Sequence, residues 1–191
     1  MKERNDSQPL SGTIQLDDVY WRGELRGGGC GSKNKTPFVA TVSINEGGHP
    51  ITMHLNVVKG FRLKEISRWA KRHLQAGSIV FSDGLACFSA IKEAECEHIS
   101  MVTGGRPESM TKIEFAWVNT MISNVKTAMT VSYHAINPKH LPRYLAEFCY
   151  RFNRRFQLEA MIPRFSYIAL YIALRNPPMP TRLLSMAEDY G

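Results

Sequence analysis

Three oxygen-bearing side chains and one lysine stand where they could carry metal-dependent chemistry. Asp17 lies in a segment rich in β-branched and aromatic residues (TIQLDDVYW), and Asp83 ends a short apolar run (SIVFSD). Asn119 precedes Lys126 by seven residues. Mg²⁺ prefers oxygen ligands in near-octahedral geometry, and a pair of such ions can stabilise the attacking and leaving oxygens of a phosphoryl transfer. Two neighbouring strands and a helix packed on them would bring the three oxygen ligands together.

Each of these residues also has a simpler interpretation. A strand aspartate is often a solvated residue at a sheet edge, and an aspartate before glycine, as at Asp83, is commonly part of a turn. Asn119 and Lys126 would be ordinary surface residues of a helix. On a helix, their separation places both side chains on one face about 10 Å apart along the axis. From there Lys126 could hold a DNA phosphate beside the metals. The spacing alone leaves both interpretations open.

The elements that must position these residues follow the order of a layered α/β domain. Segments rich in β-branched and aromatic residues predict strands, and apolar residues at helical spacing predict helices. Thr111 and Glu114 fit a capping box. Strands are expected over residues 13–21, 38–44, 51–58, 78–83 and 98–102. Helices are expected over residues 63–75, 85–95, 112–129, 138–155 and 160–174.

These elements predict one domain over residues 13–175. Residues 1–12 are polar, and we expect them to be loose. The Pro-rich end, residues 176–191, is expected to be an irregular tail. The glycine- and lysine-rich stretch 23–35 is expected to be a loop, and it contains no complete nucleotide-binding motif.

Composition narrows the class of partner. The net charge of +7 favours a polyanion such as nucleic acid. The four cysteines, Cys30, Cys87, Cys96 and Cys149, form no closely spaced pair, so we expect no zinc site. We expect these cysteines to be reduced thiols. The most apolar run (FSYIALYIAL) is too short to cross a bilayer and no signal peptide opens the chain, so we expect a cytoplasmic protein without a membrane partner.

Beyond these patterns, the chain resembles the DDE-superfamily transposases of bacterial insertion sequences. More narrowly, it resembles the ISXO2-like group, whose triad is often Asp-Asp-Asn followed by lysine. The matching segments are LDDVYWRG (16–23), FSDGLACF (81–88), WVNTMISNVKTAM (117–129) and SYHAINPKHLPRYLAEFCYRFNRRF (132–156). They come in the family's order, and the last is the most recognisable.

The resemblance implies a ribonuclease H-like fold, with a mixed central sheet, helices on both faces and further helices at the C-terminal end. It also implies DNA cleavage and strand transfer with two Mg²⁺ or Mn²⁺ ions. By position, Asp17 matches the ligand that would bridge both ions, Asp83 holds one ion, and Asn119 holds the other. Lys126 matches the basic residue that would place a phosphate. His134 matches a position that is usually histidine.

Two adjacent acidic residues compete for the first ligand position. Asp18 stands where the family often has glutamate. Side chains alternate along a strand, so Asp18 is expected on the same face as Leu16. We therefore assign Asp17 as the first ligand.

Arginines on the predicted helix 138–155 are candidate contacts to DNA phosphates. Arg143, Arg151 and Arg154 line a face away from the apolar stripe of that helix. Glu147 can pair with Arg143 and with Arg151 at a spacing of four residues. A solvated, salt-bridged face is the alternative interpretation.

The resemblance implies the catalytic core of a transposase that acts on element ends and target DNA in the bacterial nucleoid, as a homodimer or larger assembly. The family normally carries an amino-terminal zinc ribbon and helix-turn-helix, whereas 16 residues precede Asp17 here. We therefore expect an isolated or truncated core. Two alternatives stay open: a ribonuclease H-like nuclease, and a non-catalytic remnant that binds DNA or an intact transposase.

Overall fold

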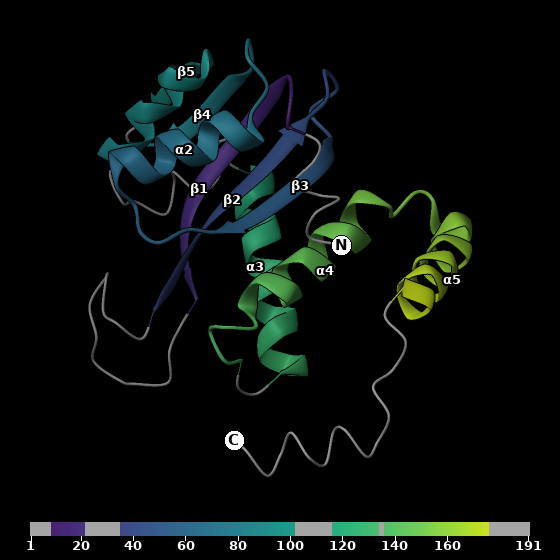
Figure 1. The fold of residues 1–191 in the computed structure, drawn as a ribbon. Helices are drawn as coiled ribbons and strands as arrows, with labels where there is room; N and C mark the ends of the chain where they lie inside the picture. Colours follow the sequence, from purple (N-terminus) through teal and green to yellow (C-terminus); the bar gives the residue numbers. More distant parts are fainter. Residues whose placement is uncertain (1–8, 22–34, 102–115, 134–135, 176–191) are drawn as a thin grey trace. The chain divides into compact units, whose positions relative to one another are not determined.

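The computed structural model describes residues 9–21, 35–101, 116–133 and 136–175 (Figure 1). Most of the predicted loose segment, most of the glycine-rich stretch, the capping box, His134 and the predicted tail lie outside these residues. The chain divides into two compact units, Met1–Asn153 and Arg154–Gly191. The second unit contains helix α5 (Leu158–Arg175), and the other elements belong to the first.

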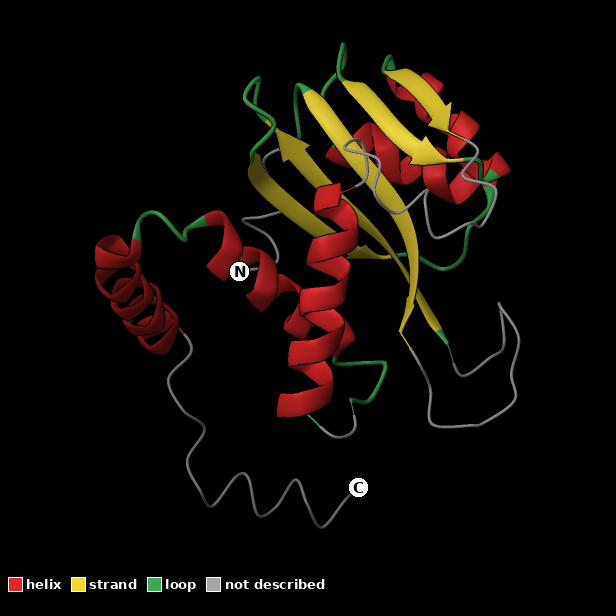
Figure 2. Ribbon diagram, turned by 180° about the vertical axis from the view of Figure 1, so that it is seen from behind, coloured by secondary structure: helices red, strands yellow, loops and turns green. Residues whose placement is uncertain are grey.

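The first unit is built on one mixed sheet with the strand order β3-β2-β1-β4-β5 (Figure 2). The three strands β1, β2 and β3 pair antiparallel, while β4 pairs parallel with both β1 and β5. All five predicted strands are present, and their ends fall within two residues of the predicted ones. The strands are β1 (Thr13–Trp21), β2 (Thr36–Ile44), β3 (Pro50–Val57), β4 (Ile79–Asp83) and β5 (Glu97–Met101).

Helices cover both faces of this sheet. Helix α2 (Leu63–His73) and the 3₁₀-helix η1 (Ala86–Ala94) cover one face, and α2 stands in front of the strands in Figure 1. Helices α3 (Ala116–Ser132) and α4 (Leu141–Asn153) cover the other face, where Figure 2 shows α3 lying across the strands. A five-stranded mixed sheet between two helical layers is the ribonuclease H-like α/β architecture that was predicted.

The central strand β1 contributes to both layers of the core because its side chains alternate between the two faces. Ile14 and Leu16 are fully buried beneath α2 and η1. Val19 belongs to the core beneath α3 and α4. By the same alternation, Asp17 faces the α3 side of the sheet and Asp18 faces the α2 side.

Two helices differ from their predicted form. Residues 85–95 were expected to form an α-helix, but the chain forms a 3₁₀-helix there. Its buried residues Phe88, Ile91 and Ala94 recur every three residues, which is the period at which 3₁₀ side chains stack above one another. The predicted helix 138–155 begins only at Leu141, because Asn137 forms a turn by accepting the His140 N–H at 2.8 Å.

A side chain at the end of α4 forms hydrogen bonds with the backbone of the edge strand β3. Asn153 accepts the Met53 N–H at 2.7 Å and donates to the Met53 carbonyl at 3.0 Å. This amide therefore occupies the two backbone groups that a further strand would use.

Candidate active site

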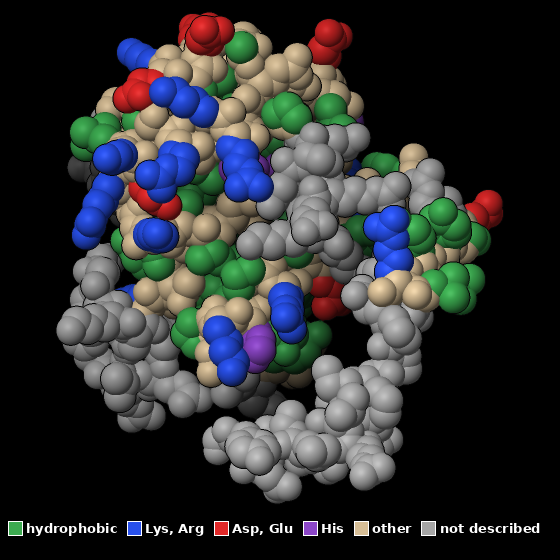
Figure 3. Space-filling view, in the orientation of Figure 1, with side chains coloured by type: hydrophobic (Ala, Val, Ile, Leu, Met, Phe, Trp, Pro, Cys, Tyr) green, Lys and Arg blue, Asp and Glu red, His purple; other side chains and the backbone are tan. Residues whose placement is uncertain are grey.

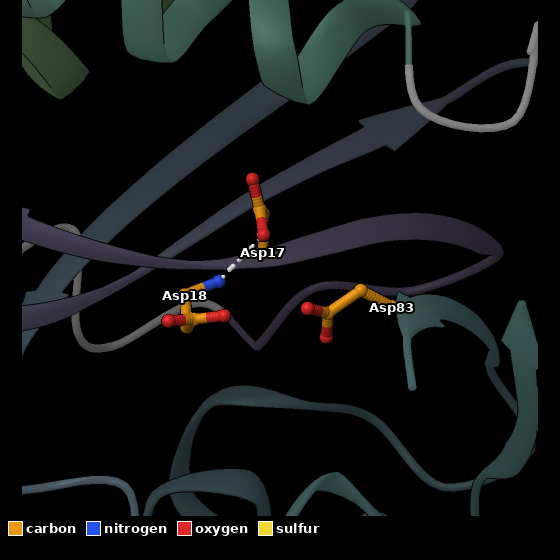
Figure 4. A group of neighbouring side chains, drawn as sticks. All are labelled: Asp17, Asp18 and Asp83. Atoms are coloured by element: carbon orange, nitrogen blue, oxygen red, sulfur yellow. Dashed lines mark hydrogen bonds between the residues drawn. The ribbon is translucent and has the colours of Figure 1, made fainter. Parts of the chain in front are cut away.

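Three aspartates from two adjacent strands form an acidic group (Figure 4). Asp17 and Asp18 come from β1, and Asp83 is the last residue of β4. One carboxylate oxygen from each lies within 4.8 Å of the others. The parallel register explains this closeness, because Leu16 of β1 lies opposite Ser82 of β4. The residues that follow on each strand are therefore neighbours.

The carboxyls of Asp17 and Asp18 lie on opposite sides of β1, and the carboxyl of Asp83 approaches both from β4. Figure 4 shows Asp17 pointing to one side of the strand and Asp18 to the other, with Asp83 directed toward the pair. The Asp18 N–H donates to Asp17 Oδ1 at 2.9 Å. The Leu85 N–H donates to Asp83 Oδ1 at 3.2 Å. Asp83 is thus both a turn residue and a member of the acidic group, so its two interpretations are compatible.

Burial and crowding raise the pKa values of the Asp17 and Asp18 carboxyls. Burial is the largest cause raising the pKa of Asp17 to about 7, and the charges of Asp18 and Asp83 add to it. Burial also leads in raising the pKa of Asp18 to about 6, followed by the charge of Asp83. The positive charge of Lys126 lowers the pKa of both carboxyls. A divalent cation at this position would offset the same repulsion much more strongly.

Helix α3 is tied to β1 by one buried side chain. Gln15 is fully buried, two residues before Asp17 on β1. Its Oε1 accepts the N–H groups of Trp117 and Val118, each at 3.0 Å. These N–H groups lie at the start of the described part of α3. Asn119 follows immediately and is half-buried.

Uncharged side chains lie beside the acidic group. Burial, followed by the charge of Asp18, raises the pKa of the Cys87 thiol to about 11, so the thiol is uncharged near pH 7. Ser82 Oγ lies 2.7 Å from Nε2 of His98 and 2.8 Å from the carbonyl oxygen of Asp83. These contacts hold the end of β4 without adding charge to the acidic group.

The structure brings together Asp17 and Asp83 and adds Asp18, which the sequence assignment passed over. Alternation does send Asp18 to the other face, but Asp83 stands at the end of its strand and approaches both neighbours. The consecutive acids in LDDVYW are the signal that marks Asp18. Lys126 lies near enough for its charge to act on Asp17 and Asp18. The role of Asn119 as a ligand stays a prediction.

The candidate DNA-binding arginines fall in different settings. Arg143 is exposed on α4. Arg151 lies 3.9 Å from Glu147 and over the ring of Phe148, at 5.0 Å from its centroid. This is the pairing that the alternative interpretation expected. Arg154 belongs to the second unit. Contact of these arginines with DNA stays a prediction.

Other possible sites are few within the described residues. There, the acidic group is the one cluster of three or more His, Cys, Asp or Glu side chains that could hold a metal. Cys87, Cys96 and Cys149 are free thiols, and Cys30 lies outside the described residues. No helix in the described part is long and apolar enough to cross a membrane.

Comparison with known families agrees with this geometry. The model of the ISXO2-like transposase domain matches residues 9–153. The matched region contains all five strands, helices α2 to α4 and the acidic group, and it ends where the first compact unit ends. No curated protein matches the chain at a significant level. Since the match spans well over half of the sequence, the chain belongs to the ISXO2-like transposase domain family of insertion-sequence transposases in the DDE superfamily.

Proposed function

We propose that this chain is the catalytic core of a transposase that cleaves and joins DNA strands with two divalent metal ions, Mg²⁺ or Mn²⁺. The observation that carries the proposal is the acidic group, whose oxygens lie within 4.8 Å of one another on adjacent strands. Carboxylate oxygens are the ligands that such hard cations prefer. The raised pKa values of Asp17 and Asp18, caused first by burial and then by neighbouring carboxyls, agree with a site that a bound cation would stabilise.

Each residue has a distinct part in the proposed reaction. Asp17 would hold both ions, Asp83 one, and Asn119 the other through its neutral amide oxygen. Asp18 is a further candidate ligand, since its carboxylate belongs to the same group. When bound, the ions activate a water or a DNA 3′-hydroxyl and stabilise the leaving oxygen. Lys126 would hold the phosphate beside the acidic group.

DNA is the proposed partner, both as the element ends and as the target. The chain belongs to a transposase family, whose substrate is DNA, and it carries a net charge of +7. Assembly on paired ends as a homodimer or larger complex is part of the proposal.

Strand cleavage and strand transfer by the purified chain would test this function. DNA carrying the element ends is supplied in excess, and Mg²⁺ or Mn²⁺ is titrated. Asp83→Asn keeps the shape of the side chain and removes its charge. We expect it to lower both activities by at least ~100-fold, more than the loss usual for residues that only support a ligand. Glu97→Gln, an exposed residue on β5, is the matched control and should behave as the parent.

The products separate the alternatives. Joined strands support a transposase. Metal-dependent nicking without joining indicates a ribonuclease H-like nuclease. Absence of both products at every metal concentration, with DNA binding retained, indicates a non-catalytic remnant that binds DNA or an intact transposase.

A further inference from the structure

The exposed face of α2 is basic. Figure 3 shows lysine and arginine side chains gathered over this helix. Helix α2 covers the face of the sheet opposite α3 and α4. We name this surface the α2 basic face. Its six exposed cations lie on α2 or in the segment just before it, and they are Lys59, Arg62, Lys64, Arg68, Lys71 and Arg72.

Most of this charge is not neutralised by neighbouring acids. Arg68 lies 3.4 Å from Glu65, and Lys71 lies 3.3 Å from Glu93. Within the described residues, the other four cations of the α2 basic face have no salt bridge. The surface therefore keeps a positive excess that a polyanion could neutralise.

Lys71 and Arg72 in the last turn favour the helix dipole, but the rest of the arrangement does not serve the stability of the helix. Lys64, Arg68 and Arg72 follow one another at intervals of four residues, so like charges repel along one line of the surface. Arg62 is the N-cap residue and makes no side-chain capping hydrogen bond, and Lys64 lies in the first turn. Positive charge at this end opposes the helix dipole. A bound anion would relieve both unfavourable interactions.

The α2 basic face begins at the end of the sheet that carries the acidic group. Phe61 packs edge-on against Tyr20, with ring centroids 5.3 Å apart, and against Phe88 at 6.2 Å. Tyr20 lies two residues beyond Asp18 on the same face of β1. Arg62 follows Phe61 in the chain, so the α2 basic face begins near the acidic group. From Lys64 to Arg72 the row extends about 12 Å along the helix.

We propose that the α2 basic face binds the phosphate backbone of duplex DNA that passes the acidic group. The inference rests on the proposed function and adds a contact surface on the face of the sheet opposite Lys126. A row of cations about 12 Å long matches several successive phosphates, which follow at roughly 3.4 Å of axial rise per strand. Contacts of this kind position DNA without reading its sequence.

Salt-dependent binding tests the proposal. The full chain is titrated against a fluorescent duplex in EDTA, so that binding is measured without cleavage. Lys64→Gln combined with Arg72→Gln removes two cations that have no salt bridge in the described part of the chain. We expect the slope of log K against log salt to become shallower by about 2. Affinity at ~100 mM salt should fall by about ten-fold.

Two controls isolate the position of the charge. Lys139→Gln with Arg175→Gln also removes two exposed cations, and it should change the slope by less than ~0.5. Lys64→Arg with Arg72→Lys keeps the charge and should bind like the parent. Protection of Lys64 from acetylation by bound DNA, read by mass spectrometry, locates the contact directly.

Two duplexes distinguish which DNA is held. One ends in a free 3′-hydroxyl, like a cut element end, and the other is a closed circle, like target DNA. Weaker binding of either one by the double glutamine variant supports the proposal and identifies the source. Unchanged slopes on both overturn it. If the parent still cleaves DNA in that case, only the α2 basic face is contradicted; absence of both cleavage and DNA binding contradicts the proposed function as well.

Discussion

At the residue scale, negative charge is concentrated on three half-buried side chains. Oxygen atoms of Asp17, Asp18 and Asp83 lie within a few ångströms of one another. The thiol of Cys87, whose pKa is raised by burial and by the charge of Asp18, is uncharged. Lys126 supplies partial compensation from α3. Without a metal, this group opposes folding at neutral pH.

The stability of the metal-free protein should therefore fall as the pH rises through 6 and 7. The folded pKa values, about 7 for Asp17 and about 6 for Asp18, lie above the ordinary value of 3.8. Their contribution to stability is complete below about pH 4 and is lost as the pH rises toward the folded pKa. The loss is at most ~1.4 kcal/mol for each pH unit that separates the ordinary pKa from the folded one. Thermal melts in EDTA between pH 5.5 and 8 would measure this loss.

Asp17→Asn should flatten this pH dependence, and Mg²⁺ should restore the stability of the parent at pH 8. Glu97→Gln, which removes an exposed carboxyl, should leave the profile of the parent unchanged. A parent protein whose melting temperature in EDTA rises from pH 5.5 to 8 would contradict this account of the acidic group.

Asn119 can be tested against a neighbour on the same helix. Asn119→Ala removes the proposed amide ligand and should abolish or severely reduce cleavage. Asn119→Asp supplies the negative charge that an amide lacks and should retain metal binding. Asn124→Ala changes an exposed asparagine of α3 and should cleave like the parent. The measurement is the Mg²⁺ dependence of strand cleavage. If Asn119→Ala cleaves normally, Glu114 becomes the next candidate for the third ligand.

At the element scale, Gln15 joins β1 to the start of the described part of α3. Its amide oxygen accepts the N–H groups of Trp117 and Val118, and Val118 is buried. Gln15→Leu should therefore destabilise the fold by about 2–4 kcal/mol, measured by urea denaturation. Gln15→Glu keeps an acceptor oxygen and should recover part of that loss.

The same variants separate positioning from simple stability. If Gln15 sets the distance between the aspartates and Asn119, Gln15→Leu should raise the Mg²⁺ concentration needed for half-maximal cleavage, even at a temperature where the variant is fully folded. A variant that is less stable but has the metal dependence of the parent would restrict Gln15 to a structural role.

The elements could be predicted from the sequence to different degrees. All five strands were predicted because β-branched and aromatic residues mark them and glycines or turns bound them. The 3₁₀ form of η1 was not predicted, since its burial period of three emerges only when it packs against α2 and β5. Asp17 and Asp83 could be chosen from spacing and resemblance, but Asp18 required the register between β1 and β4.

At the scale of the whole molecule, acidic and basic side chains lie in separate regions. The acidic group lies between a cation on α3 and the α2 basic face on the other side of the sheet. In the proposed function, the acidic ligands would bind the metal ions, while cations on both sides would neutralise the DNA backbone. The net charge of +7 summarises this division without revealing it.

The contact of the Asn153 amide with β3 has a consequence for solubility. β3 is an edge strand, and an open edge is a template on which a second molecule can add its own strand. By occupying both backbone groups of Met53, Asn153 interrupts that template. Asn153→Ala should expose it and increase concentration-dependent aggregation, measured by light scattering, while Asn124→Ala should not. If copies of the chain assemble on DNA as proposed, this contact would keep them from also joining through their sheet edges.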